Sequence, residues 1–243
     1  MSTSARREGF ASAAQQAPSL QELAAVARRE AEAGGMSIDV GVYESVGRDP
    51  MAPLIGGGEV SAPVGFFGRD PGRDEIRHME PLIGAAGQMV RAGVHRALHG
   101  CEPPDFEASQ AIASEVFFSN TVPYKPVGNK AWSMAVKRRF HSVIASYLVD
   151  HWRGSDLITL GNVAFEWFGM ESSREERARL KAFFQGEGRY ERSLEVEVTS
   201  PLSGATRPLT LHPLPHPSPL NATWYKRFPG LLDERLVSLG VGR

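Results

Sequence analysis

Cysteine is almost absent from this sequence, since Cys101 is the only one among 243 residues. A single cysteine excludes a disulfide framework within the chain, and it excludes a zinc or iron–sulfur site made from four cysteines of one chain. Long apolar runs are also missing, because none approaches the ~18 residues of a membrane span. The N-terminal segment MSTSARREGFAS lacks a continuous apolar stretch, so no secretory signal is expected. We therefore expect a cytoplasmic protein with no membrane partner.

An excess of either charge is missing too. The 27 Lys and Arg residues nearly balance the 28 Asp and Glu residues, which leaves a net charge of −1. This balance excludes a protein that coats nucleic acid by charge alone, although it allows a local basic face. The stretch 125–139 contains basic residues and no acidic one. Arg138 and Arg139 in this stretch are candidate DNA contacts, and a solvated helix surface is the alternative.

The first 60 residues are interpreted as an N-terminal helix and loop extension. Ser19 and Glu22 have the spacing of a capping box, which predicts a helix that ends at Gly34 and Gly35. Residues 36–61 are rich in glycine and proline and are expected to form a loop. The glycine run 56–58 lacks the Lys-Ser/Thr pair of a phosphate-binding loop, so we expect a plain turn there.

The remainder of the chain, 61–243, alternates between strand and helix patterns. Short apolar runs predict buried strands at 62–68, 114–120, 155–161 and 207–214. Helical patterns occur at 84–98, 131–152 and 172–185. The alternating segment 194–198 predicts a hairpin with the last of these strands. This order predicts an α/β fold, a three-layer α/β/α sandwich with a central, mainly parallel four-stranded sheet.

Ligands of such sheets bind beyond the carboxyl ends of the strands, so function is expected just after residues 68, 120, 161 and 212. Asp70 lies there in a Gly-Xaa-Asp-Pro-Gly turn, where Pro71 restricts its backbone. A carboxylate held in this way can act as a general base or stabilise a cation, and the alternative is an Asp that caps a turn. The amide edge of Asn120 complements N3–H and O4 of uracil and mismatches cytosine. The alternative is a strand-end Asn that satisfies a loop.

A proline-rich segment follows the last predicted strand. His212 and His216 have the spacing of a helical metal pair, but prolines at 213, 215, 217 and 219 forbid that helix. The prolines instead form a stiff loop that holds His216 and Ser218 at fixed positions. A neutral imidazole donor at His216 can stabilise an anion that forms on a ligand oxygen. The alternative is an ordinary loop histidine.

Together these segments resemble the uracil-DNA glycosylase superfamily. The segment 68–72 looks like its water-activating loop, and 216–221, His-Pro-Ser-Pro-Leu-Asn, looks like its second motif. Asn120 falls where the family reads uracil, and 160–164 resembles the glycine-rich turn that grips the DNA backbone. The segment 80–88 resembles part of the iron–sulfur branch of the family.

The chain also departs from the family at several positions. Tyr124 and His141 stand where the iron–sulfur branch has two cysteines, so the resemblance implies that the cluster is lost. Leu82 stands at the place of an aromatic that stacks on uracil. Gly72 replaces a tyrosine that, in another branch, closes the pocket beside C5 of uracil, so we expect an open wall there unless another residue supplies it.

The resemblance implies a monomeric base-excision repair enzyme that flips uracil out of single- or double-stranded DNA. It hydrolyses the N-glycosidic bond, leaves an abasic site, and requires no metal or organic cofactor. Asp70 is expected to stabilise the sugar cation and orient water, and His216 to stabilise the uracil anion. Residues expected to bind the base are Arg69, Gly72, Leu82 and Asn120. Residues expected to contact DNA are Gly161, Asn162, Ser218, Leu220 and Asn221, with Leu220 as the wedge in the base stack.

Two other functions remain open at this point. The protein could release another deaminated base such as hypoxanthine, with Asn120 reading a different edge. It could also bind lesions with little turnover, because Leu82 weakens the pocket. An unrelated α/β hydrolase is disfavoured, since the sequence contains no Gly-Xaa-Ser-Xaa-Gly elbow.

Overall fold

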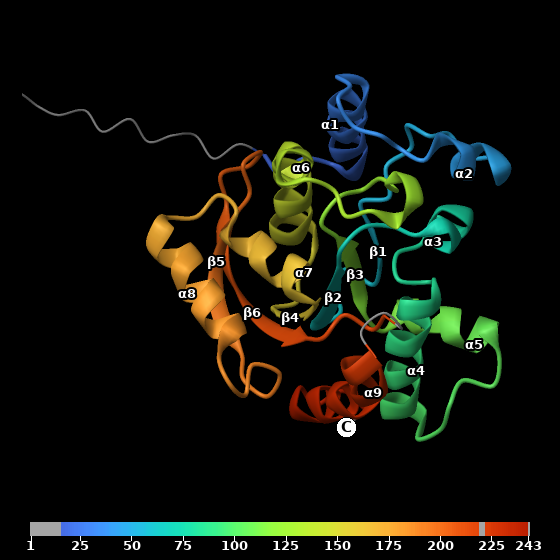
Figure 1. Cartoon of the computed structure of the whole chain (residues 1–243), viewed down its shortest axis with the longest axis vertical. Coiled ribbons are helices and arrows are strands. Elements are labelled where there is room, and N and C mark those ends of the chain that lie inside the picture. Colours follow the sequence, from blue (N-terminus) through green and yellow to red (C-terminus); the bar gives the residue numbers. More distant parts are fainter. Residues whose placement is uncertain (1–15, 219–221, 243) are drawn as a thin grey trace, which may run out of the picture.

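The computed structural model describes residues 16–218 and 222–242. At its centre lies a sheet with the strand order β1-β3-β2-β4-β6-β5, six strands within the described ranges (Figure 1). The strands are β1 Gly56–Gly58, β2 Val64–Gly68, β3 Phe117–Asn120, β4 Asp156–Leu160, β5 Leu194–Thr199 and β6 Thr206–Leu214. Strands β3, β2, β4 and β6 are parallel neighbours, and β1 and β5 add antiparallel edges.

The predicted α/β class and the mainly parallel sheet are confirmed, but the sheet has six strands rather than four. Strand β5 forms the expected hairpin with β6. Strand β1 consists of the glycine run that we expected to be a plain turn, and that expectation is wrong. A side chain at Gly56 would overlap the ring of Tyr147, and one at Gly58 would overlap the carbonyl oxygen of Val116. Only glycines let this edge strand approach β3 so closely.

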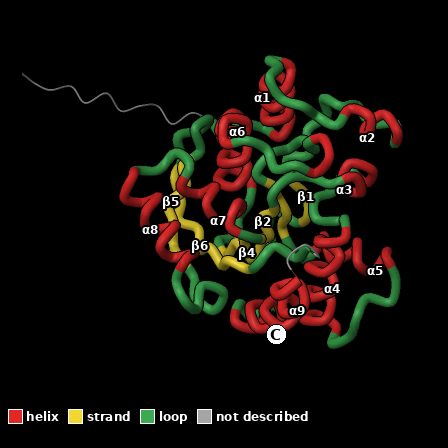
Figure 2. Tube along the Cα trace, viewed as in Figure 1, coloured by secondary structure: helices red, strands yellow, loops and turns green. Residues whose placement is uncertain are grey.

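Helices cover both faces of the sheet, as Figure 2 shows by their positions around the strands. The helices are α1 Leu20–Glu32, α2 Val40–Ser45, α3 Arg73–His78, α4 Ala85–His99, α5 Phe106–Ala111, α6 Met134–Ser146, α7 Asn162–Glu166, α8 Arg174–Gln185 and α9 Ala222–Ser238. Consecutive side chains of β2 point to opposite faces of the sheet. Phe67 therefore packs in one apolar core and Phe66 in the other. The first core lies beneath α1, α6 and α7, and the second beneath α4 and α9.

The N-terminal region packs into the first core. Ser19 caps α1 through the predicted capping box with Glu22. Leu23 and Ala27 of α1 are fully buried, and α1 contacts α6. The segment expected to be a loop contains the short helix α2, whose Tyr43 is also buried. In the described part of the chain, no helix combines the length and the apolar character that a membrane crossing needs.

Candidate active site

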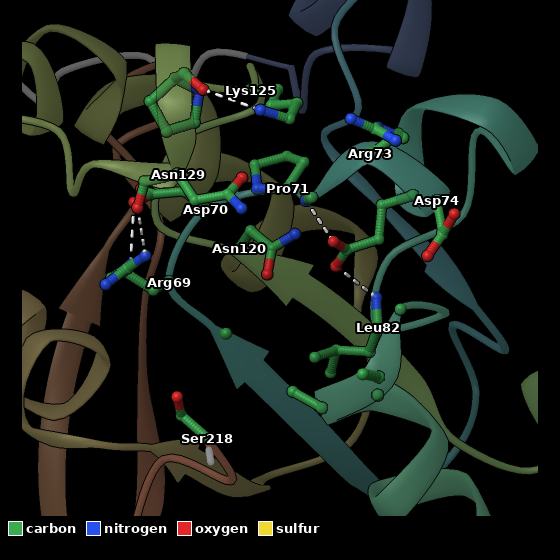
Figure 3. A pocket seen from close by; sticks show the side chains of 18 of the residues that line it. Arg69, Asp70, Pro71, Arg73, Asp74, Leu82, Asn120, Lys125, Asn129 and Ser218 are labelled. Carbon is green, nitrogen blue, oxygen red and sulfur yellow. Dashed lines mark hydrogen bonds and ion pairs between the residues drawn. The ribbon is translucent and has the colours of Figure 1, made fainter. Parts of the chain in front are cut away.

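A cavity of about 830 Å³ opens at the carboxyl ends of the central strands. The segments that follow β2, β3 and β6 line it, together with the loop that precedes α4. Figure 3 shows Arg69, Asn120, Leu82 and Ser218 around this hollow. The structure therefore brings together residues that are far apart in the sequence, and it does so at the edge of the sheet that the strand order predicts.

Asp70 sits directly after β2 with its side chain only 1% exposed. The hydroxyl of Thr121 donates to the carbonyl oxygen of Arg69 and lies 3.3 Å from Asp70 Oδ1. Arg69 Nε lies 3.1 Å from Asp70 Oδ2, as an ion pair out of line for a hydrogen bond. Burial raises the pKa of the Asp70 carboxyl, while the charges of Arg69 and Lys137 oppose that rise. The carboxyl group is thus held in one orientation between two cations.

Arg69 anchors the same loop to the neighbouring segment. Its Nη2 donates to the carbonyl oxygen of Asn129 at 3.1 Å. The backbone N–H of Thr121 donates to the carbonyl oxygens of Gly68 and Arg69 at 3.1 and 2.9 Å. These bonds tie the loop after β2 to the loop after β3, so the two loops keep a constant spacing across the cavity.

Asn120 ends β3 beside Gly68 of β2 and is 1% exposed. A side chain at Gly68 would overlap Asn120 Oδ1, so glycine is needed for the amide to lie here. Asn120 Nδ2 is buried and has no hydrogen-bond acceptor among the described residues. A buried donor without an acceptor is costly, so this amide is available to pair with a ligand.

Glu75 of α3 is a member of this site that sequence reasoning missed. Its side chain accepts a hydrogen bond from the backbone N–H of Gly72 through Oε2, and from that of Leu82 through Oε1 at 2.9 Å. Burial raises the pKa of Glu75 to about 7. A Cβ at Gly72 would lie 2.7 Å from Glu75 Oε2. The space beside Gly72 is therefore filled by another residue, because the Glu75 carboxyl stands there. The Gly-Xaa-Xaa-Glu spacing was the signal that could have revealed it.

Leu82 lines the cavity next to Glu75 and is 6% exposed, in a left-handed backbone conformation with φ of 54°. Arg91 of α4 holds the backbone at Leu82 in that conformation. Its fully buried guanidinium donates to the carbonyl oxygens of Leu82 at 2.7 Å and Pro81 at 3.0 Å, and pairs with Glu80 at 2.6 Å. A side chain at Gly87 of α4 would overlap the Leu82 backbone, so the segment that contains Leu82 packs closely against the first turn of α4.

His216 completes the cavity from the loop after β6. Gly161 has a φ of 87°, and a Cβ there would lie 2.9 Å from His216 Cβ. Burial, together with the charge of Arg69, lowers the pKa of His216 and favours the neutral ring. The N–H of Ser218 donates to the His216 carbonyl oxygen at 2.9 Å, and Ser218 also lines the cavity. Asn162 is exposed at the start of α7.

Other predicted site residues lie apart from this cavity. Arg138 is exposed and pairs with Glu171 at 3.6 Å. The guanidinium of Arg139 donates to the carbonyl oxygens of Glu30, at 3.2 Å, and Gly34. Arg139 therefore binds the C-terminal end of α1, and we no longer assign it to DNA. Leu220 and Asn221 lie outside the described residues.

The positions linked to the iron–sulfur branch are occupied by packed rings. Tyr124 is fully buried with its ring 5.4 Å from that of Phe140, and His141 stacks on Trp167 at 4.6 Å. Among the described residues there is no group of three or more His, Cys, Asp or Glu side chains that could hold a metal ion. These residues do not fit a cluster, and we derive no step through one.

His212 is likewise engaged by the protein. Its Nε2 lies 2.9 Å from Asp156 Oδ1, and its Nδ1 lies 3.0 Å from the hydroxyl of Ser193. His212 is 3% exposed and lies in the strand β6. His212 and His216 are therefore not on one helix, as a helical metal pair would require. His212 therefore has a structural role that is separate from the cavity.

Comparison with known proteins agrees with this geometry. No curated protein matches the chain. The family model of the uracil DNA glycosylase superfamily matches residues 55–239. That range contains β1 to β6 and every residue described above as lining the cavity. The chain therefore belongs to the uracil DNA glycosylase superfamily, whose members are DNA glycosylases.

Proposed function

We propose that this protein releases uracil from DNA by hydrolysis of the N-glycosidic bond and leaves an abasic site. The observation that carries this proposal is the meeting of Asp70, Asn120 and His216 in one cavity, each delivered by the end of a different strand. These three groups match the three tasks of the reaction, which are to hold the base, to stabilise the sugar cation and to stabilise the departing base.

Recognition of the base is assigned to Asn120. Its Oδ1 accepts from N3–H of uracil and its Nδ2 donates to O4. Cytosine presents an acceptor and a donor at those two positions, so both contacts become repulsive. The buried, unpaired Nδ2 supports this assignment, because pairing with a base removes its desolvation cost. Leu82, which also lines the cavity, supplies an apolar contact to the flipped base.

Bond cleavage is assigned to Asp70 and His216. The bond between C1′ and N1 breaks with both electrons on the base, so the sugar becomes cationic and the base anionic. The Asp70 carboxylate stabilises the cation and orients the water that adds to C1′, and the proton of that water is passed on to solvent. His216 donates from its neutral ring to the base oxygen, together with backbone N–H groups near Arg69.

DNA contacts are assigned to the turn at Gly161 and Asn162, to Ser218, and to Leu220 and Asn221 outside the described residues. One chain supplies all of these groups, so we propose that it acts as a monomer. No metal or organic cofactor takes part in any of these steps.

Measurement of base release tests the proposal. Purified protein is incubated with single-stranded and duplex oligonucleotides that contain uracil, thymine or hypoxanthine, and free base is quantified. Release of uracil alone, lost in Asn120→Ala, is the expected result. Preferential release of hypoxanthine would reassign the base, and tight binding without any free base would favour a lesion-binding protein.

A further inference from the structure

A second cavity, of about 410 Å³, lies beside the candidate active site. It is bounded by the N-terminal half of α6, by α7 with the turn that follows it, and by α8, which Figure 1 shows grouped over one face of the sheet. We call it the flanking cavity. Its lining residues are Met134, Lys137, Arg138, Val163, Glu166, Trp167, Gly169, Met170, Arg177, Leu180 and Lys181.

The lining separates into an apolar part and a basic part. Trp167, Met170 and Leu180 are buried, and Met134 is 50% exposed although it is apolar. Four basic residues surround them, against one acidic residue, Glu166. Arg138, Arg177 and Lys181 are exposed, whereas Lys137 is 5% exposed. An apolar floor beneath a basic rim suits a ligand that has a flat ring and a negative charge.

Polar groups in this cavity lack partners. Trp167 is 1% exposed, and its buried indole N–H has no acceptor among the described residues. Lys181 forms no hydrogen bond or ion pair with any residue that the structure describes. The ammonium group of Lys181 is exposed on the rim of the cavity and leaves one contact for an anionic ligand to satisfy.

The cavity is joined to the candidate active site through Lys137. The ammonium group of Lys137 interacts electrostatically with Asp70, Arg69 and Glu166. Lys137 is therefore shared, since Asp70 and Arg69 line the first cavity and Glu166 lines the second. Val163 of the flanking cavity also follows directly on the turn at Gly161 and Asn162.

We propose that the flanking cavity binds a nucleotide of the DNA strand next to the flipped base. The phosphate rests on Lys181 and Arg177, and the base lies on the half-exposed side chain of Met134. This subsite rests on the proposed function for its location along the strand. Its chemistry does not depend on catalysis, because phosphate and base are present in any single strand.

Charge reversal at Lys181 tests the subsite, with a matched reversal elsewhere as the control. Lys181→Glu changes an exposed residue of the rim. Arg153→Glu makes the same change in net charge at an exposed residue just before β4, at the amino-terminal ends of the strands and away from the candidate active site. Affinity for a uracil-free single strand of about fifteen nucleotides is measured over a range of salt concentrations. We expect Lys181→Glu to weaken binding about tenfold and to lower the slope of log K against log salt by about 0.7.

A second measurement locates the subsite on the strand. Uracil is placed near the 5′ end of one oligonucleotide and near the 3′ end of another, and release kinetics are measured for both. The proposed subsite lies on one side of the flipped base along the strand, so Lys181→Glu should raise KM for one oligonucleotide and leave kcat unchanged. Equal effects on both would overturn the placement next to the flipped base.

The two measurements separate the proposals. If the wild type releases no uracil, the proposed function fails, and the salt dependence with uracil-free DNA still decides the subsite. If Lys181→Glu weakens binding and lowers the salt slope no more than Arg153→Glu does, the flanking cavity does not bind DNA and the proposal is overturned.

Discussion

Glu75 provides the sharpest test of how this site is built. The Glu75→Gln substitution keeps the size of the side chain and removes its ability to ionise. In the folded protein Glu75 is 8% exposed, and its carboxyl group accepts from two backbone N–H groups, those of Gly72 and Leu82. Those bonds favour the ionised form, but burial outweighs them and raises the pKa of Glu75 from 4.5 to about 7.

The stability consequence follows from proton binding. Between about pH 4.5 and 7 the folded protein retains the Glu75 proton, whereas the unfolded chain has lost it. The folded state then binds more protons, so the free energy of unfolding falls as pH rises through this window. The full change corresponds to about 3 kcal/mol. The neutral acid and the glutamine amide each present one strong acceptor, so at low pH the two proteins should differ by only about 1 kcal/mol.

Urea denaturation at about pH 5 and about pH 8 measures this effect in wild type and variant. We expect Glu75→Gln to gain about 2 to 3 kcal/mol relative to wild type between the two conditions, with an unchanged denaturant slope. Glu44→Gln, at an exposed position of α2, is the control and should gain nothing. A difference between wild type and Glu75→Gln that is the same at both pH values would refute the reasoning about Glu75.

Three further predictions concern the candidate site. Asp70→Asn should lower uracil release by roughly 10²–10⁴ with DNA affinity retained. In the wild type, burial raises the pKa of Asp70, so activity should be lost on acidification at a pH above the usual aspartate pKa. Unchanged turnover of Asp70→Asn in a release assay would remove Asp70 from this role. His216→Ala should add about 2.7–4 kcal/mol to the barrier, seen in kcat; an activity restored by zinc would contradict a donor role. Gly72→Ala places a Cβ 2.7 Å from Glu75 Oε2 and should lower the free energy of unfolding, measured by urea denaturation, by about 1–3 kcal/mol. The double variant Gly72→Ala/Glu75→Ala should recover part of this loss. An unchanged stability of Gly72→Ala would show that the Glu75 carboxyl can move away freely.

Much of the fold could be predicted from sequence because its signals are local. The four central strands are short apolar runs bounded by turn residues, and each forms within a few residues of its predicted place. Ser19 and Ser173 cap α1 and α8 through neighbours three residues away. Asp70, Asn120 and His216 were predicted as site residues because strand ends meet at one edge of a parallel sheet, and the cavity contains all three.

Residues whose environment comes from distant segments could not be predicted in this way. The glycine run 56–58 became a strand because the free edge of β3 accepts it, and its own residues carry no strand signal. The spacing from Gly72 to Glu75 is local, but it does not show that the segment at Leu82 folds back over the carboxyl group and buries it.

The basic stretch on α6 shows the division most clearly. Lys137, Arg138 and Arg139 are consecutive in sequence, and the sequence by itself determined that a helix would carry three adjacent positive charges. Only the tertiary structure decided that Lys137 is buried near Asp70, that Arg138 is exposed, and that Arg139 binds the end of α1. Successive helix residues point about 100° apart, so the role of each charge depends on the segment packed against its own side of the helix.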